Sequence, residues 1–358
     1  MSRTAQAIIN LAALKHNLGI VKQHAPQSQV MAVIKADAYG HGMLEVATAL
    51  VDADAFAVAC LSEARILREA GINKKILCLE GMTSADELEA FAQQQIDMVV
   101  HHEWQLQVLA ESQHQAALNV WLKHDSGMHR LGFNDEQLQR GLALCKSCSA
   151  INRVSLFTHM ANADNKNDTS TTQQIERFNA ATESFVGEKS LSNSACILGW
   201  PDAHADWVRP GIMLYGVNPF ITGSAAECDL KPVMTFKSQL ISIRQQKQGD
   251  PIGYGGEWTC PNDMTLGVVA VGYGDGYPRH AKPGTKVLIG GKKYPLVGRV
   301  SMDLLTIDLS GAVDTAVGDA VTLWGEGLPV EQIAADAKTI AYELLCGVSQ
   351  RVAHVYVD

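Results

Sequence analysis

Short apolar runs alternate with longer amphipathic stretches from about residue 30 to residue 214. In the longer stretches apolar positions recur every three or four residues, which predicts helices, as in 61–70, 85–94, 103–113 and 135–147. The short runs predict parallel strands, at 30–35, 55–59, 75–79, 97–100, 118–123, 154–158, about 189–192, and 206–208. Eight strands with intervening helices predict an α/β fold with a (β/α)8 TIM barrel, although the pattern alone also allows an open doubly wound sheet.

The pattern changes near Leu230. Beyond it, residues of alternating character form runs separated by Gly-rich turns, at 233–244, 266–272, 286–290 and 304–308. These runs predict a mainly antiparallel β domain, closed by one helical segment around 331–345. Residues 4–9 predict a strand before the first helix, with Asn10 as the N-cap. We therefore expect a barrel over residues 1–229 and a β domain over 230–358.

Composition and charge narrow the class of protein. The chain has 358 residues, 47% of them hydrophobic and 19% charged, which is typical of a globular protein with a barrel and an accessory domain. A net charge of -9 without a long basic run argues against a nucleic-acid surface. No apolar segment is long enough to span a membrane and the N-terminus lacks a signal-peptide pattern, so we expect a cytoplasmic protein.

The eight cysteines are scattered and do not form a disulfide framework. Cys145 and Cys148 form a C-x-x-C, but it lies in a helical pattern, without a second pair or a histidine at zinc spacing. We therefore expect reduced thiols and no metal site.

The ends of the predicted strands carry most of the candidate chemistry, because barrels of this type hold their active sites there. The first apolar run leads into Lys35 within AVIKADAYGHG (32–42). A desolvated lysine at such a mouth can form a Schiff base with a carbonyl group, and the ordinary alternative is a surface lysine. Other strand ends hold KHDSGMHRLG (123–132), Thr158-His159, Asn193-Ser194 and RPGIMLYG (209–216). Taken singly, His159 could be a core histidine and Arg209 an ion-pair partner.

AVIKADAYGHG, KHDSGMHRLG and RPGIMLYG, with three later blocks, resemble the alanine racemases, enzymes of fold type III that use pyridoxal 5'-phosphate (PLP). The later blocks are DPIGYGGEWTC (250–260), VGYGDGYPR (271–279) and VGRVSMDL (297–304). The resemblance covers nearly the whole chain and implies a PLP-dependent racemase that interconverts L-alanine and D-alanine. The D-alanine would serve peptidoglycan synthesis, or the enzyme would degrade it. In this family the N-terminal strand joins the second domain.

The resemblance also assigns the residues that bind the cofactor. Lys35 matches the lysine that holds PLP as a Schiff base and acts as one of two acid/base groups. The phosphate would be bound by Tyr39, Ser194 and the backbone N–H groups of Gly211 and Ile212, since such donors suit an anion. Arg209 matches the arginine at the pyridine nitrogen. Because arginine stays protonated, that nitrogen has to accept a hydrogen bond, which favours return of the proton to Cα over transamination.

Racemisation needs a base on each face of Cα, and the resemblance assigns the second base to Tyr254. The family is a homodimer in which each shared site combines the lysine of one chain with the tyrosine of the other. His159 matches a histidine that contacts both this tyrosine and Arg209. The positions that match residues at the substrate are Arg130, Tyr273, Met302 (through its backbone) and Asp303.

Two positions leave the resemblance open to alternatives. Lys123 falls where many members carry a carbamylated lysine that holds the arginine matched by Arg130. The other interpretation is an inward-facing lysine paired with a carboxylate such as Asp125. Some members carry an inner-gate tyrosine where this chain, in GVSQRV (347–352), has Gln350. A smaller polar group there is also compatible with a broader amino-acid racemase.

Two further functions of this fold stand as alternatives. A PLP-dependent decarboxylase would be expected to carry a Cys-Asp motif in the β domain, and the nearest pair, Cys228-Asp229, precedes that domain. A non-enzymatic PLP-binding protein would consist of the barrel alone, so residues 230–358 count against it.

Overall fold

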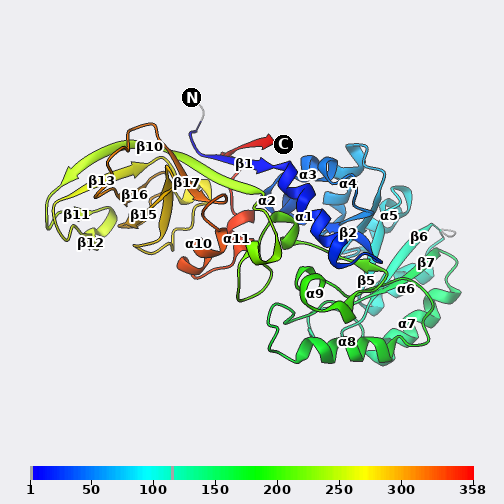
Figure 1. The fold of residues 1–358 in the computed structure, drawn as a ribbon. Coiled ribbons are helices and arrows are strands. Elements are labelled where there is room, and N and C mark those ends of the chain that lie inside the picture. The colour runs from blue at the N-terminus through cyan, green and yellow to red at the C-terminus, as the bar shows by residue number, and fades with distance from the viewer. Residues whose placement is uncertain (1–2, 114–116) are drawn as a thin grey trace.

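The computed structural model describes residues 3–113 and 117–358. Eight parallel strands close into a barrel, each pairing with its neighbour in chain order and the last with the first (Figure 1). These strands are β2 (Gln29–Val33), β3 (Ala55–Val58), β4 (Lys75–Cys78), β5 (Asp97–Val100), β6 (Leu118–Lys123), β7 (Ile151–Phe157), β8 (Lys189–Ser190) and β9 (Trp207–Val208). The predicted (β/α)8 barrel is confirmed, and the open sheet is excluded.

Helices between the strands cover the outside of the barrel (Figure 1). They include α1 (Leu11–His24), α3 (Met43–Ala49), α4 (Leu61–Glu69), α5 (Leu88–Gln93), α6 (Glu103–Glu111), α7 (Asp135–Ser147) and α8 (Ser170–Ala181). Polar N-caps determine where two of them begin. The Asn10 side chain accepts a hydrogen bond from the Ala13 N–H at 2.8 Å, as the sequence predicts, and Asn134 accepts one from the Gln137 N–H at 2.8 Å.

The last two barrel strands, β8 and β9, are only two residues long each. Ser190 pairs with Phe157 on one side and with Trp207 on the other, and Trp207 pairs with Gln29 of β2, so the barrel still closes. The buried rings of Trp207 and Trp121 meet edge to face at 6.3 Å between centroids. These large side chains supply contact area where the short strands offer few ladder hydrogen bonds.

The second domain is a mainly antiparallel β structure that lies beside the barrel (Figure 1). Its main sheet has the order β13-β16-β15-β14-β17-β10-β1-β18, and β10 also pairs with β13. The strands are β1 (Gln6–Asn10), β10 (Met234–Gln246), β13 (Met264–Val269), β14 (Lys286–Ile289), β15 (Lys292–Val297), β16 (Leu305–Asp308), β17 (Ala320–Trp324) and β18 (Ala353–Val357).

The strand β1 lies in the sheet of the second domain although α1, which follows it directly, belongs to the barrel (Figure 1). Ile8 pairs antiparallel with Thr235 of β10 and parallel with Val355 of β18. The pair β1–β18 is thus the parallel exception in a mainly antiparallel sheet. Three segments far apart in the sequence therefore meet at the junction of the two domains.

The C-terminal helical segment differs from the prediction of one helix around 331–345. It forms two helices, α10 (Val330–Asp336) and α11 (Ala341–Cys346), separated at Lys338, whose φ is 56°. A left-handed residue cannot continue a right-handed helix, so the chain changes direction there. The turn brings α11 against α2 (Lys35–Gly40), so closely that a Cβ at Gly40 would clash with the Leu345 carbonyl.

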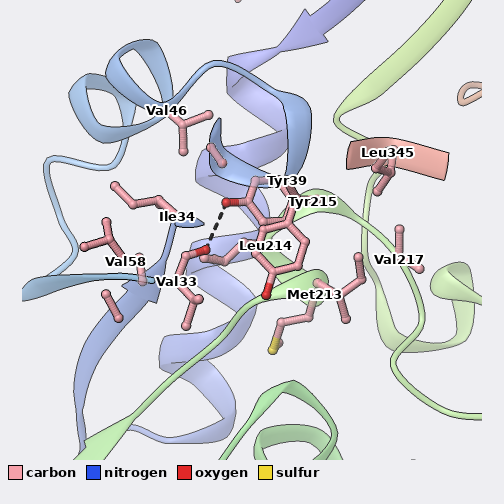
Figure 2. Packing of buried hydrophobic residues seen from close by; sticks show 14 of the residues in the cluster. Val33, Ile34, Tyr39, Val46, Val58, Met213, Leu214, Tyr215, Val217 and Leu345 are labelled. Carbon is pink, nitrogen blue, oxygen red and sulfur yellow. Dashed lines mark hydrogen bonds between the residues drawn. The ribbon is translucent and has the colours of Figure 1, made fainter. Parts of the chain in front are cut away.

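Buried apolar side chains pack where the barrel mouth meets α11 (Figure 2). Tyr215 lies among Val33, Tyr39 and Leu345 in this cluster, and its hydroxyl donates to the Val33 carbonyl at 3.0 Å (Figure 2). The mouth is therefore built on a rigid, close-packed base. Within residues 3–113 and 117–358, no helix has the length and apolar character that crossing a bilayer requires.

Candidate active site

A cavity of about 710 Å³ opens at the C-terminal ends of the barrel strands. Its lining brings together residues that follow β2, β6, β7 and β9, the position at which such barrels hold their chemistry. Every barrel residue that the sequence singled out for the site lies in this lining: Lys35, Tyr39, Lys123, Arg130, His159, Ser194, Arg209, Gly211 and Ile212.

The segment after Lys35 is a turn of left-handed helix. Residues 36–39 have φ between 52° and 55°, although none of them is glycine. Such a conformation costs about 1–2 kcal/mol per residue, so it persists only where the surroundings hold it. The turn brings Lys35 and Tyr39 to the same cavity wall.

Side chains from the turn and from α4 hold this strained backbone. The Glu63 carboxylate accepts the N–H groups of Ala36 and Ala59, each at 2.7 Å. The buried ring of His41 hydrogen-bonds through Nδ1 to the Tyr39 carbonyl at 2.9 Å. Burial lowers the pKa of His41 to about 4, so the ring is neutral and donates from Nδ1.

Hydroxyl and amide groups converge on one corner of the cavity. The buried Ser194 hydroxyl accepts the Gly211 N–H at 2.9 Å and the Met213 N–H at 3.4 Å. A Cβ added at Gly211 would lie 2.7 Å from the Tyr39 hydroxyl, so only glycine leaves this corner open. Backbone N–H groups and hydroxyls in such a turn suit a phosphate group.

Arg209 lies buried beside this corner, with 4% of its surface exposed. Its guanidinium donates to the Ser190 hydroxyl at 2.6 Å and to the Thr158 carbonyl at 2.7 Å, both neutral acceptors. Burial lowers the pKa of Arg209 to about 9, which keeps the group cationic at neutral pH. Among residues 3–113 and 117–358 it forms no ion pair with a carboxylate, so its positive charge has no direct partner of opposite charge.

His159 contacts this guanidinium. Its Nδ1 lies 3.4 Å from Nη2 of Arg209. Burial, and then the positive charges of Arg209 and Lys123, keep the pKa of His159 well below its usual value. The imidazole is therefore neutral at physiological pH, and Nδ1 can accept a hydrogen bond from Arg209.

Lys123 lies at the end of β6 and is 5% exposed. Burial lowers its pKa to about 8, and the cations Arg130 and Arg209 lower it further than Asp125 raises it. Lys123 and Asp125 do not form an ion pair, and Asp125 instead accepts the N–H groups of Gly127 and His129.

The cavity fits PLP by the chemistry of its donors. It offers a lysine amine for an aldehyde, N–H and hydroxyl groups for a phosphate, and a guanidinium for a ring nitrogen. The positive charge of buried Arg209 and the corner that a Cβ at Gly211 would fill are the two observations that favour this ligand.

The four predicted residues of the second domain lie elsewhere. Tyr254, Tyr273, Met302 and Asp303 do not line the cavity, and Tyr254 is 73% exposed. Tyr254 lies between the short strands β11 (Pro251–Ile252) and β12 (Trp258–Thr259), at the end of the domain that points away from the barrel (Figure 1). One chain therefore does not bring Lys35 and Tyr254 together.

Among the cavity-wall residues that the sequence analysis missed are two from the second domain. Tyr342 and Cys346 of α11 line the cavity, and the Tyr342 ring lies 5.8 Å from the Tyr39 ring. Their spacing of four residues on one helix face was the available signal. Gln350, where some family members carry a gate tyrosine, is exposed and, like Tyr254, does not line the cavity of its own chain.

Comparison with known proteins covers the whole chain. The family model described as "Alanine racemase, N-terminal domain" matches residues 9–219, and "Alanine racemase, C-terminal domain" matches residues 233–356. The chain is similar to the alanine racemases of Aeromonas hydrophila (49% identical over 99% of this chain and 100% of that one) and Coxiella burnetii (48% over 99% of each). Its structure is similar to that of the biosynthetic alanine racemase from Pseudomonas aeruginosa, with a TM-score of 0.97 and 45% identity over 100% of both chains.

Proposed function

Because this chain belongs to the alanine racemase family, we propose that the cavity at the barrel mouth is its active site. The protein is a PLP-dependent isomerase that interconverts L-alanine and D-alanine. The observation that carries the site assignment is the shared cavity wall of Lys35, Ser194 and Arg209, which supplies an amine, a phosphate donor and a cation.

In this proposal Lys35 holds PLP covalently, and Tyr39, Ser194 and the N–H groups of Gly211 and Ile212 bind its phosphate. When bound, PLP withdraws electrons from Cα of the amino acid and so makes the Cα proton removable. Arg209 would donate a hydrogen bond to the pyridine nitrogen. Because the guanidinium keeps its own proton, it limits this withdrawal and favours proton return to Cα.

Lys35 is also the base on one face of Cα. It removes the proton from D-alanine and returns it to that face in the reverse direction. Inversion requires a second proton carrier on the opposite face, which we assign to Tyr254. Since Tyr254 is exposed and lies outside the cavity of its own chain, it has to enter the cavity of another copy.

A two-fold homodimer satisfies this requirement. Placing the second domain of one subunit over the barrel of the other supplies each cavity with the partner's Tyr254, and symmetry builds both sites at once. Neutral His159 accepts from Arg209 and offers its other ring nitrogen to the partner's Tyr254. Arg130, with Tyr273, Met302 and Asp303 of the partner subunit, lines the pocket for the substrate carboxylate and its entrance.

We further propose that Lys123 is carbamylated. A buried lysine with a pKa of about 8 has a substantial neutral fraction at physiological pH, and the neutral amine attacks carbon dioxide with loss of one proton. Arg130, Arg209 and Lys35 destabilise an ammonium at this position and would stabilise the negative carbamate instead. The carbamate would hold Arg130 toward the substrate.

Supply of D-alanine for peptidoglycan is the cellular role we favour, because of the similarity to a structure described as a biosynthetic enzyme. Deletion of the gene should make growth depend on added D-alanine. Growth without D-alanine, with loss of growth on D-alanine as sole nitrogen source, would indicate degradation instead.

Borohydride trapping tests the site. The reductant should fix the cofactor to a single peptide that contains Lys35, and Lys123→Met should give the same labelled peptide. Lys123 is the informative control because it is the other lysine in the lining of the cavity that the structure describes. Labelling of Lys123, or of any lysine other than Lys35, would contradict the assignment.

Substrate selectivity needs a separate measurement. Tyr342 lines the cavity and supports a preference for small side chains. Gln350, where some family members carry a gate tyrosine, is the position that would favour a broader substrate range. We expect kcat/KM to be highest for alanine when serine and lysine are assayed beside it. Comparable values for the three amino acids would favour a broader racemase.

A further inference from the structure

One buried carboxylate holds the turn at residues 272–276. The Asp275 side chain is fully buried and accepts the Gly272 N–H at 2.9 Å. It also accepts Nε of Arg3 and Nε of Arg351, each at 2.8 Å. Burial by itself would raise the pKa of Asp275, but the donors Arg3, Gly272 and Arg351 together lower it, so the carboxylate is ionised at neutral pH.

The same two arginines reach the neighbouring turn at residues 301–303. Arg351 donates through Nη2 to the Asp303 carboxylate at 2.6 Å and to the Met302 carbonyl at 3.4 Å. Arg3 donates to the Asp303 carbonyl at 3.1 Å. Each arginine therefore joins Asp275 to the 301–303 turn, one from the N-terminal and one from the C-terminal part of the chain.

The backbones of the two turns are in direct contact. The Tyr273 N–H donates to the Ser301 carbonyl at 3.0 Å, and the Gly274 N–H donates to the Met302 carbonyl at 2.8 Å. A Cβ at Gly272 would clash with the Ser301 carbonyl. Because the turns leave no room between them, a shift of Asp275 or of either arginine has to move both.

A purely structural role explains this arrangement poorly. Burying a charge is expensive, and apolar side chains of similar size stabilise a domain at least as well. The two arginines instead donate to the Met302 and Asp303 carbonyls and to the Asp303 carboxylate. The side chains of Met302 and Asp303 are exposed, and so is the side chain of Tyr273. These hydrogen bonds thus hold the exposed residues of the two turns to the buried carboxylate of Asp275.

We propose that Asp275, through Arg3 and Arg351, is a positioning residue for the reaction, setting where Met302, Asp303 and Tyr273 meet the substrate in the partner's cavity. This inference rests on the proposed function, in which these residues line the substrate pocket of the dimer. Displaced pocket walls weaken substrate binding while leaving the proton-transferring groups in place. The expected signature is a raised KM with a nearly unchanged kcat.

The test compares Asp275→Asn, Arg351→Gln and Arg351→Lys in the holoenzyme. We expect Asp275→Asn and Arg351→Gln to raise KM for alanine about tenfold and to change kcat less than about threefold. Arg351→Lys should restore part of the KM, because lysine keeps one charged donor. Amide hydrogen exchange should become faster in 270–277 and 299–304 and stay unchanged in the barrel strands.

Arg140→Gln is the matched control. Arg140 also joins two carboxylates, Glu103 and Glu136, but on the outside of the barrel. We expect Arg140→Gln to leave KM, kcat and amide hydrogen exchange in both turns unchanged. If Asp275→Asn fails to fold, the two Arg351 variants test the proposal on their own. The Arg351 side chain is 39% exposed, so we expect both variants to fold.

Two contrary results are distinguishable. Lower thermal stability with an unchanged KM in the Asp275 and Arg351 variants would overturn the positioning role, provided that Asp303→Asn or Tyr273→Ala raises KM. If Asp303→Asn and Tyr273→Ala also leave KM unchanged, the proposed pocket itself is wrong, and the inference falls with it.

Discussion

The carboxylate of Glu63 accepts the backbone N–H of Ala36 at 2.7 Å, one residue after the lysine that we assign to the cofactor. The second carboxylate oxygen accepts the Ala59 N–H, so Glu63 ties the left-handed turn to the end of β3. Glu63 of α4 thereby stabilises the left-handed backbone of residues 36–39 in the cavity wall.

Glu63→Ala should lower the free energy of unfolding by about 1–3 kcal/mol, because two N–H groups lose a charged acceptor. Glu63→Gln keeps one acceptor and should lose about half as much. Denaturant unfolding measures the change, and absorbance titration of PLP should show weaker binding in both variants. Glu69→Gln, on the exposed part of the same helix, serves as the control. Unchanged PLP affinity in Glu63→Ala would mean that the turn needs no support from α4.

Subunit complementation tests the shared site. Lys35→Ala and Tyr254→Phe should each be nearly inactive. After unfolding together and refolding, about half of the dimers should be mixed, and one site in each should be intact, which gives about a quarter of wild-type activity. Activity that stays at the level of the single variants, after mixing has been verified, would rule out sites built from two chains.

Tyr254→Phe should separate the two faces of Cα. Deuterium exchange in heavy water should persist for D-alanine, because Lys35 remains, and should collapse for L-alanine, because the proton carrier on that face is gone. Mass spectrometry of recovered alanine measures both rates. Equal losses for the two enantiomers would argue against a face-specific tyrosine.

Arg209→Glu should raise transamination relative to racemisation. A carboxylate favours a protonated pyridine nitrogen, which draws more electron density from Cα. Pyruvate formed per racemisation event is the measurement. Arg209→Lys, which keeps a cationic donor, should stay close to wild type in this ratio. An unchanged ratio in Arg209→Glu would remove the electronic role given to the arginine.

Lys123 makes stability depend on pH when carbon dioxide is absent. Its pKa is lowered from 10.5 to about 8, so between these values the unfolded chain binds the proton and the folded one does not. Stability therefore rises with pH across this window and falls as pH drops through 8. Relative to Lys123→Met, the wild type should gain up to about 3 kcal/mol from pH 8 to 10.5.

In bicarbonate a carbamylated Lys123 carries no ammonium in the folded state, whereas the lysine of the unfolded chain still binds a proton below pH 10.5. The rise of stability with pH should therefore extend below pH 8. Carbon-13 NMR with labelled bicarbonate should give one carbamate signal in the wild type and none in Lys123→Met. A pH dependence that stays confined to the range above pH 8 in bicarbonate, without the carbamate signal, would leave Lys123 as an unmodified amine.

The barrel was predictable because its strands are buried on both faces and read as continuous apolar runs, as in Val30–Ile34. Strand β15 was missed because it begins with Lys292 and Lys293, which conceal the alternating pattern. The break between α10 and α11 depends on the left-handed conformation of Lys338, and lysine carries no signal for it.

The cavity was predictable where a residue follows a strand, as Lys35, His159 and Arg209 do. For Tyr342 the sequence offers only a shared helix face with Cys346, and its place in the cavity wall depends on how α11 docks on the barrel after the unexpected break. The left-handed turn at residues 36–39 could not be predicted from the sequence either. Residues 36–39 contain no glycine, and their conformation follows from distant partners such as Glu63.

The position of β1 between β10 and β18 has a consequence during synthesis on the ribosome. β1 is made before both of its neighbours, β10 and β18, which begin only at Met234 and at Ala353. At typical translation rates the strand waits roughly 20–70 s for the second of them. The nascent chain therefore carries an open strand edge beside a forming barrel until β18 has been made, and this last pairing joins two strands that are made far apart in time.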